Sequence, residues 1–381
     1  MTPPYPKYHL AEFPHQFRVR YPGKTIMRYY NKHNERWEKL NGEQVANLCL
    51  SAAKGLAYLQ IQTGDRIAIY SPNRVGCIAT ELGIFMMRAV SVPLYATSTP
   101  DQVQFIVEDA GVETMFVGGQ FQYNNAYEVQ QRGGSLRRLI IFDNEVVLAP
   151  GDTTSMYYDE FVRRGDSVAY ENKANVTASQ SLATDLAVII YTSGTTGKSK
   201  GVMLHHSNFI EQLYAHQLKY PFITNRDVSM CFLPLNHILE KAWSYLCLSM
   251  GCQVAVLSDP KRILEALPMV RPSMMGNVPR FWEKVYIGVQ DKIDRSPKLV
   301  RYILRHSIQV GERYFFDFVN EGKKPPLYLR LLNKLYDKTL FAKVKKAIGI
   351  QRGRFFPAAG ASVSPEILRF LRAINVPMCV G

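Results

Sequence analysis

The first half of the chain alternates between two patterns of hydrophobic and polar positions. Short apolar runs, typical of buried strands, are separated by segments whose apolar residues recur every three or four positions, typical of amphipathic helices. The predicted strands are RIAIY (66–70), SVPLY (91–95), ETMFVG (113–118) and RLIIFD (138–143), and the predicted helices cover 43–59, 77–88 and 100–109. Repeated strand, helix, strand units predict a doubly wound, mostly parallel α/β sheet with right-handed crossovers.

A second, similar unit is predicted after a polar stretch. Residues 150–181 carry few apolar positions, so we expect an irregular connection there, with a first α/β subdomain at 1–180 and a second at 181–381. The second subdomain opens with the strand LAVIIYTS (186–193). Further elements are predicted at 207–218 (helix), 228–233 (strand), around Trp243 (helix), at 253–258 (strand) and from Pro260 (helix).

The pattern changes again after residue 280. Over 281–350, long stretches rich in Tyr, Phe, Leu, Lys and Arg predict a helical insertion. The segment RFFPAAG (354–360) then predicts a strand and a glycine turn. Ser364 suits an N-cap and Pro365 a first helical position, which predicts a helix to Ala373 before the strand VPMCV.

Charge is the feature of the composition that says most about possible binding partners. The 381 residues carry a net charge of +14, and 285–354 alone hold 16 Lys and Arg against 6 Asp and Glu, a net of +10. Such a basic block suits nucleic acid, an anionic membrane or an anionic cofactor, or it is a solvated helical face. We expect a peripheral contact between 285–354 and an anionic membrane, and no nucleic acid.

Other features limit the class of protein. With 47% hydrophobic residues the chain can bury a large core, but no run of about eighteen apolar residues predicts a membrane span, and the N-terminus lacks a secretory signal. We therefore expect a cytoplasmic protein that is peripheral on the inner membrane face. The six cysteines form no CxxC pair, which argues against a zinc site or a disulfide framework and favours reduced core thiols.

The segment YTSGTTGKSKGV (191–202) is the clearest sign of chemistry. It follows a buried strand, and its two glycines let the backbone fold closely round an anion while its hydroxyls and lysines offer donors and positive charge. A Walker loop needs four residues between Gly and Gly-Lys, whereas two separate Gly194 from Gly197. The pattern therefore indicates a phosphate-binding loop outside the P-loop NTPases.

This segment resembles the signature loop of the adenylate-forming superfamily, which includes acyl-CoA synthetases, luciferases and peptide-synthetase adenylation domains. FLPLNHILEK (232–241) is similar to the motif whose His lies near the carboxylate and the nucleotide, and AAGASVSPE (358–366) to the adenine-binding strand and turn. LPLNHILEK, VPRFWEKVY (278–286) and LFAKVKKAIG (340–349) resemble the long-chain acyl-CoA synthetase branch, which also carries a helical insertion. The likeness covers nearly the whole chain.

The resemblance implies an ATP-dependent ligase that converts a long-chain fatty acid and ATP to acyl-adenylate and pyrophosphate, after which the CoA thiol displaces AMP. It implies that Thr195 contacts the ATP phosphates and binds Mg²⁺, and that His237 faces the acyl carboxylate. Further residues would surround the same phosphates: Thr192, Ser193, Gly194, Thr196, Gly197 and Lys198. Gly360, Ala361 and Ser362 would flank the adenine.

Two neighbouring charges in the motif receive no chemical role. Glu240 and Lys241 match the branch motif, and we expect them to be exposed helix charges. A tryptophan that gates the acyl tunnel in some relatives would fall near Lys241, and Trp243 lies two positions away, which argues against such a gate.

The resemblance also implies motifs beyond this chain. The next one, of the form YGxTE, would begin immediately after Gly381, followed by a ribose-binding Asp, a hinge and a small C-terminal domain with a catalytic Lys. We therefore expect an incomplete nucleotide-binding lobe that makes no acyl-CoA by itself. The alternatives are an acyl-AMP or aryl-acid ligase of the same fold, or a non-catalytic fragment that binds nucleotide or acyl chains.

Overall fold

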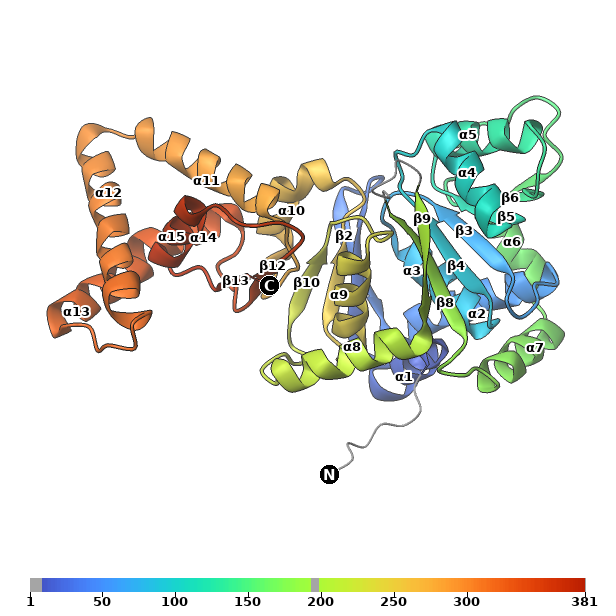
Figure 1. The fold of residues 1–381 in the computed structure, drawn as a ribbon, viewed down its shortest axis with the longest axis horizontal. Coiled ribbons are helices and arrows are strands. Elements are labelled where there is room, and N and C mark those ends of the chain that lie inside the picture. Colours follow the sequence, from blue (N-terminus) through green and yellow to red (C-terminus); the bar gives the residue numbers. More distant parts are fainter. Residues whose placement is uncertain (1–8, 193–198, 381) are drawn as a thin grey trace. The chain divides into compact units, whose positions relative to one another are not determined.

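The computed structural model describes residues 9–192 and 199–380 (Figure 1). The chain forms two compact units, one of Met1–Arg226 with Pro234–Asp259 and the other of Asp227–Leu233 with Pro260–Gly381. This division differs from the expected boundary after residue 180, because the strand that follows residue 181 joins the main sheet of the first unit.

A seven-stranded sheet forms the centre of the first unit. Its spatial order is β7 (Ser155–Tyr157), β6 (Arg138–Ile141), β5 (Thr114–Val117), β3 (Arg66–Tyr70), β4 (Val90–Leu94), β8 (Leu186–Thr192) and β9 (Lys200–His205). Neighbouring strands run parallel except for the antiparallel pair β8 and β9. The predicted mostly parallel α/β class is confirmed. β9 was not predicted, because its mostly exposed side chains leave no buried apolar run.

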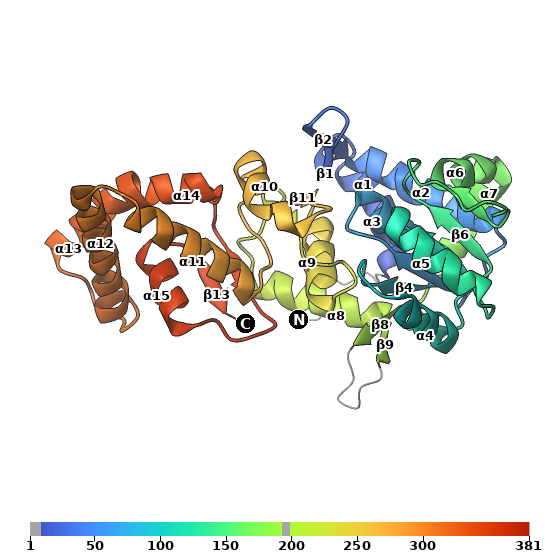
Figure 2. The same cartoon turned by 90° about the horizontal axis from the view of Figure 1, so that it is seen from above.

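Helices pack on both faces of this sheet (Figures 1 and 2). They are α2 (Gly42–Tyr58), α3 (Val75–Met86), α4 (Pro100–Ala110), α5 (Gln120–Gln131), α6 (Tyr158–Gly165), α7 (Val168–Ser179) and α8 (His206–Lys219), preceded by η1 (Leu10–Glu12) and α1 (Phe13–Arg20). α2 and α4 begin with reciprocal caps, in which the side chains of Asn41 and Thr99 accept hydrogen bonds from the backbone N–H three residues later. The helices predicted at 43–59, 77–88 and 100–109 are confirmed.

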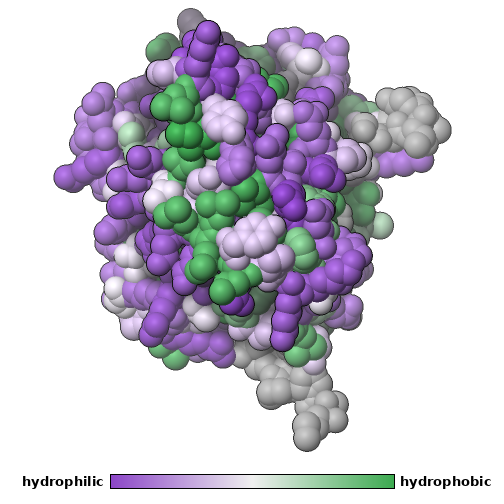
Figure 3. All heavy atoms as spheres, turned by 90° about the vertical axis from the view of Figure 1, so that its left-hand side faces the viewer, coloured by the Kyte–Doolittle hydropathy of each residue, from purple (hydrophilic) through white to green (hydrophobic). Residues whose placement is uncertain are grey.

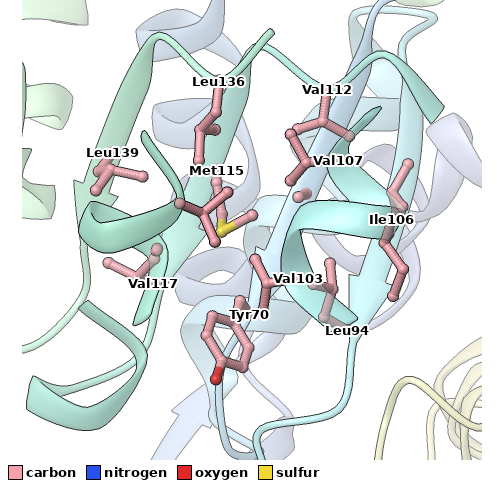
Figure 4. Packing of buried hydrophobic residues seen from close by; sticks show 14 of the residues in the cluster. Tyr70, Leu94, Val103, Ile106, Val107, Val112, Met115, Val117, Leu136 and Leu139 are labelled. Atoms are coloured by element: carbon pink, nitrogen blue, oxygen red, sulfur yellow. The ribbon is translucent and has the colours of Figure 1, made fainter. Parts of the chain in front are cut away.

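One large hydrophobic core lies between the sheet and the pair α4 and α5 (Figure 4). Val103 and Val107 of α4 face Tyr70 and Met115 of the strands, and all four side chains are at most 1% exposed. Burying side chains of this size stabilises the fold by about 1.5–3 kcal/mol each. Phe116 follows Met115 on β5, so it points to the opposite face, where its ring lies 5.3 Å from that of Phe161 on α6.

Residues 150–181, expected to be irregular, fold into β7, α6 and α7. Phe161 is fully buried and packs so closely on Gly55 of α2 that a Cβ at Gly55 would come within 2.3 Å of the ring. The Ser167 hydroxyl accepts a hydrogen bond from the Tyr170 N–H at 3.3 Å and caps α7. The prediction was wrong because each of these polar helices buries only one or two residues, which leaves only a weak apolar pattern in the sequence.

A smaller sheet in the same unit joins distant parts of the chain. β1 (Thr25–Asn31) pairs in parallel with β11 (Gln253–Val256) and antiparallel with β2 (Arg36–Asn41). The predicted strand at 253–258 and the helix around Trp243, which is α9 (Ile238–Ser249), are confirmed. β1 and β2 were not predicted, because most of their side chains are half-buried or exposed.

A buried histidine begins α8. His206 is 1% exposed, and its Nδ1 accepts a hydrogen bond from the Leu10 N–H at 3.2 Å. Its ring meets Phe85 edge to face at a centroid distance of 5.1 Å. Burial, with the positive charge that His9 can carry, lowers the pKa of His206 to about 3, while the Asp185 charge acts in the opposite direction. His206 is therefore neutral in the folded protein at neutral pH.

The second unit is mainly helical. It contains η2 (Pro260–Arg262), α10 (Ile263–Val270), α11 (Pro279–Asp294), α12 (Lys298–Glu312), α13 (Leu327–Tyr336), α14 (Ala342–Ile348) and α15 (Pro365–Ala373), with the π-helical segments η3 (Arg313–Val319) and η4 (Asp337–Phe341). α11 to α14 occupy the region where the sequence predicts a helical insertion. α15 begins at Pro365 with Ser364 in the N-cap position, as predicted, although the Ser364 side chain makes no capping hydrogen bond.

Three short strands complete this unit: β10 (Val228–Cys231), β12 (Phe356–Ala358) and β13 (Met378–Val380). β12 and β13 run parallel, and Met274 forms parallel bridges to both Ser229 and Phe355. Just before β10, the buried Asp227 carboxylate accepts hydrogen bonds from Arg354 at 2.5 and 2.7 Å and from the Ser273 hydroxyl at 2.7 Å. These contacts hold the start of β10 next to the segment that leads into β12.

Candidate functional site

The predicted phosphate loop joins the antiparallel strands β8 and β9. β8 ends at Thr192 and β9 begins at Lys200, and these two residues face each other across the pair. Thr192 is exposed, and the remaining predicted loop residues, Ser193, Gly194, Thr195, Thr196, Gly197 and Lys198, lie outside the described residues. A P-loop leads from a strand into a helix. This loop returns into a strand, which agrees with the exclusion of a P-loop NTPase.

The loop begins at the end of the sheet where ligands bind in α/β proteins. β3, β4 and β8 are parallel neighbours, so their carboxyl ends lie together. Directly after β3, the Asn73 side-chain oxygen accepts a hydrogen bond from the Leu235 N–H at 3.0 Å. Open α/β sheets bind ligands outside the carboxyl ends of their strands. The segment that carries His237 and the start of the phosphate loop therefore lie at the same end of one sheet.

His237 is the N-cap residue of α9 and is exposed. Its Nδ1 accepts a hydrogen bond from the Leu239 N–H at 3.2 Å, while its backbone carbonyl accepts one from the Lys241 N–H at 3.1 Å. Since Nδ1 is an acceptor, the neutral ring carries its proton on Nε2. His237 thus offers an N–H donor at the carboxyl end of the sheet, from a ring whose orientation is fixed by the helix.

One turn further along α9 lies a buried ion pair. Lys241 Nζ donates to both carboxylate oxygens of Glu81 at 2.6 Å, and the two side chains are 2% and 6% exposed. The hydroxyls of Ser91, at 2.6 Å, and Tyr245 also donate to Glu81. Burial, reinforced by the Glu81 charge, raises the pKa of Tyr245 well above its usual range, so this hydroxyl donates as a neutral group. The Glu81 carboxylate is fully hydrogen-bonded.

The expectation that Glu240 and Lys241 are exposed charges was wrong. Both are buried, at 1% and 2% exposure, and the Ser244 hydroxyl donates to Glu240 at 3.0 Å. α9 is buried on most of its surface, so its charged residues have no solvated face to occupy. The Glu81–Lys241 pair joins α3 to α9, and through α9 it holds the backbone of His237. Sequence reasoning missed Glu81 because its partner lies 160 residues away.

A small cavity adjoins this pair. Its volume is about 20 Å³, and its wall includes Asn73, Cys77, Glu81, Asn236 and Lys241. A cavity of this size with polar groups on its wall has room for one water molecule. It is too small for a substrate, and the ion pair beside it connects α3 to α9.

The predicted adenine turn lies in the second unit. Gly360 has φ of +90°, and a Cβ placed there would meet nothing within 4 Å. The turn follows a hydrogen-bonded segment, in which the Ala359 N–H donates to the carbonyl of the fully buried Asn277 at 3.1 Å. Ala361 and Ser362 are exposed. The result is a tight glycine turn with free space beside its backbone, which fits the edge or face of a flat ring.

Three further features bear on chemistry. Over 9–192 and 199–380, no group of three or more His, Cys, Asp or Glu is arranged to hold a metal ion. No helix in the described part of the chain is long and apolar enough to cross a membrane. All six cysteines are free thiols, five of them buried, as predicted.

Comparison with known proteins places this geometry in a family. Residues 15–380 match the model of the AMP-binding enzyme family. The chain is 28% identical to the long-chain-fatty-acid–CoA ligase FadD15 of Mycobacterium bovis, over 91% of the chain and 55% of that protein. It is 29% identical to the peroxisomal long chain acyl-CoA synthetase 6 of Arabidopsis thaliana, over 84% of the chain and 43% of that protein. The chain thus spans about half the length of these relatives.

Solved structures share the fold. FadD1, a long-chain-fatty-acid–CoA ligase from Archaeoglobus fulgidus, superposes with a TM-score of 0.69 at 17% identity, covering 99% of this chain and 64% of the other. The A-PCP didomain of a carboxylic acid reductase from Segniliparus rugosus, solved with AMP, gives a TM-score of 0.73 at 18% identity, covering 98% and 52%. With a family match over 15–380 and this shared architecture, the chain belongs to the AMP-binding enzyme family.

Proposed function

We propose that this chain forms the nucleotide-binding part of an ATP-dependent long-chain-fatty-acid–CoA ligase. The observation that carries the proposal is the arrangement at the carboxyl end of the seven-stranded sheet, where the loop rich in glycine and hydroxyl groups begins at Thr192 and Asn73 holds the segment of His237. The relatives named as long-chain-fatty-acid–CoA ligases support the same activity.

In this proposal a fatty-acid carboxylate oxygen attacks the α-phosphorus of ATP and the bond to pyrophosphate breaks. The CoA sulfur then attacks the acyl carbonyl and AMP leaves. Backbone N–H groups and hydroxyls of 192–198 bind the transferring phosphates, and His237 Nε2–H donates to the carboxylate and orients it. Gly360, Ala361 and Ser362 line the adenine site.

Mg²⁺ belongs to the same proposal. The Thr195 hydroxyl is an oxygen ligand of the kind that Mg²⁺ prefers, and Mg²⁺ usually keeps waters and substrate phosphates as its other ligands. When bound, the ion would supply positive charge to the phosphate oxygens. Our proposal assigns Thr195 to hold it and the neighbouring backbone to hold the phosphates.

We also propose a cytoplasmic location with peripheral contact between 285–354 and an anionic membrane. This part of the chain carries a net charge of +10, and each Lys or Arg near an anionic surface is worth about 1 kcal/mol. Leu299 and Tyr302 of α12 and Tyr328 and Leu331 of α13 are each at least 58% exposed. Figure 3, which views the molecule from the left-hand side of Figure 1, shows an apolar patch bordered by hydrophilic side chains.

A panel of acids tests the proposed reaction. A full-length protein that contains this chain should form palmitoyl-CoA from palmitate, ATP, Mg²⁺ and CoA. Each CH₂ buried in an apolar site contributes up to about 0.8 kcal/mol, so affinity should rise by roughly fourfold per methylene. Equal activation of acetate or benzoate would refute the long-chain substrate. Acyl-AMP without thioester would favour an acyl-AMP ligase, and ATP binding without turnover would favour a binding fragment.

Substitution of the loop threonine tests the site. In the same protein, Thr195→Ala should lower turnover by about 10²-fold, because it removes a hydroxyl that acts on charge developing in the transition state. Thr63→Ala, at an exposed turn before β3, is the matched control and should leave turnover unchanged. The measurement is ATP–pyrophosphate exchange; a Thr195→Ala rate within about threefold of wild type would show that Thr195 lacks the proposed role.

A further inference from the structure

The helices of the second unit form a groove that the proposed reaction does not use. α10, α11, α12 and α14 surround a space of about 560 Å³. Its wall is mostly aliphatic and includes Val285, Val289, Ile293, Leu304, Val344 and Ile348. Pockets that bind small molecules have volumes of about 300–1,000 Å³ and mostly apolar walls, so this groove has the size and lining of a ligand site. None of its residues belongs to the predicted ATP or acyl site.

The charges at this groove all have one sign. Lys284 and Lys292 of α11 and Lys343 of α14 contribute to the wall, and no Asp or Glu does. All three lysines are exposed, and none forms an ion pair or side-chain hydrogen bond with another described residue. Three unpaired cations beside an aliphatic wall are complementary to a molecule with an apolar chain and an anionic head group.

Gly288 keeps the middle of the groove open. It lies four residues after Lys284 and four before Lys292, so the three positions share one face of α11. A Cβ at Gly288 would meet nothing within 4 Å, and its backbone is helical, so neither crowding nor φ requires glycine there. Glycine is the weakest helix former after proline. Its effect at this position is to leave space between the two lysines.

We propose that this groove binds one long-chain fatty acid, with the acyl chain along the aliphatic wall and the carboxylate at Lys284, Lys292 and Lys343. The site lies outside the residues assigned to the ligase reaction and holds the same class of molecule that the proposed reaction consumes. A single acyl chain suits this helix-lined groove better than a flat bilayer surface does, because aliphatic side chains from four helices line it.

Binding of palmitate to the 381-residue chain, measured by isothermal titration calorimetry below the micelle concentration, tests the proposal. Gly288→Phe fills the groove and should weaken binding at least tenfold. Gly288→Ala adds one methyl group and should stay within about threefold of wild type, since little of the space is taken. The triple variant Lys284→Glu, Lys292→Glu, Lys343→Glu should also lose at least tenfold, and circular dichroism should show unchanged helix content in all three proteins.

Two further binding experiments test the chemistry of the ligand and its source. Hexadecanol has the same chain without the charge, so it should bind wild type more weakly than palmitate does and should be unaffected by the triple lysine variant. Vesicles of phosphatidylcholine with phosphatidylglycerol test a bilayer source. The proposal is overturned if Gly288→Phe and the triple variant both bind palmitate as tightly as wild type does. It is also overturned if these variants change binding to vesicles but not binding to palmitate.

This test is separable from that of the ligase reaction. In the longer protein that makes palmitoyl-CoA, Gly288→Phe should leave kcat unchanged, because Gly288 contacts none of the proposed site residues. Loss of palmitate binding with thioester formation intact supports the groove. Thioester formation that fails in wild type refutes the proposed function without affecting the calorimetric result.

Discussion

Replacing Lys241 with Met should lower the free energy of unfolding by about 3–5 kcal/mol, the range measured when one partner of a buried ion pair is removed. Met keeps most of the aliphatic stem, so the change mainly removes the cation. The Glu81 carboxylate would then be buried with only the hydroxyls of Ser91 and Tyr245 to stabilise its charge. Urea titration followed by circular dichroism measures the loss.

The double variant Glu81→Gln with Lys241→Met separates charge from packing. It removes both charges, so much of the lost stability should return, and the coupling between the two positions should exceed about 1 kcal/mol. Lys219→Met, at an exposed position of α8, is the control and should change stability by less than about 0.5 kcal/mol. In Lys241→Met, peptides from α3 and α9 should exchange their amide hydrogens faster than they do in wild type. A cost below about 1 kcal/mol for Lys241→Met would show that the pair is not buried as described.

Acid should destabilise the first unit through His206 before most carboxylates are protonated. The pKa of His206 is about 3 in the folded protein against 6.5 ordinarily, so between these values the unfolded chain binds a proton that the folded chain does not. The free energy of unfolding therefore falls as pH drops from about 6.5 towards 3, and His206 causes no change above that window. At about 1.4 kcal/mol per pH unit the full interval is worth up to about 5 kcal/mol.

His206→Asn tests this assignment. Asn keeps an acceptor for the Leu10 N–H but cannot take a proton near neutral pH. Between pH 6.5 and 4, the unfolding free energy of His206→Asn should fall less steeply than that of wild type, and the two slopes should differ by about 1 kcal/mol per pH unit. Above pH 7, plots of unfolding free energy against pH should run parallel for the two proteins. His9, whose pKa burial also lowers, should account for part of the slope that is left. Equal slopes in the two proteins would assign the acid sensitivity to other groups.

The predicted elements succeeded where burial leaves a strong pattern. RIAIY and the strand after residue 185 are buried along nearly their whole length, so their apolar runs mark β3 and β8 within one or two residues. Helix α4 also combines an apolar stripe with a cap at Thr99. β1, β2 and β9 lack such runs, because pairing with neighbours rather than burial of their own side chains holds them in place.

The sequence suggests a chemistry for the candidate site but does not encode its spatial arrangement. The residue types of 191–202 indicate a phosphate loop, and the positive φ of Gly360 agrees with the turn predicted there. The contact of Asn73 with Leu235 joins positions 162 residues apart, and no local pattern encodes it. No local pattern encodes the burial of Lys241 either. A charged residue on a helix predicts solvent exposure unless its ion-pair partner is known.

The separation of Glu81 from Lys241 has a consequence for synthesis of the protein. The two residues lie 160 positions apart, and a ribosome adds about 5–20 residues per second, so roughly 8–30 seconds pass between their translation. During that interval the Glu81 carboxylate has no cation and burying it is unfavourable. We therefore expect α3 of the nascent chain to keep this side chain in water until α9 has emerged, which makes the docking of α9 a late step of folding on the ribosome.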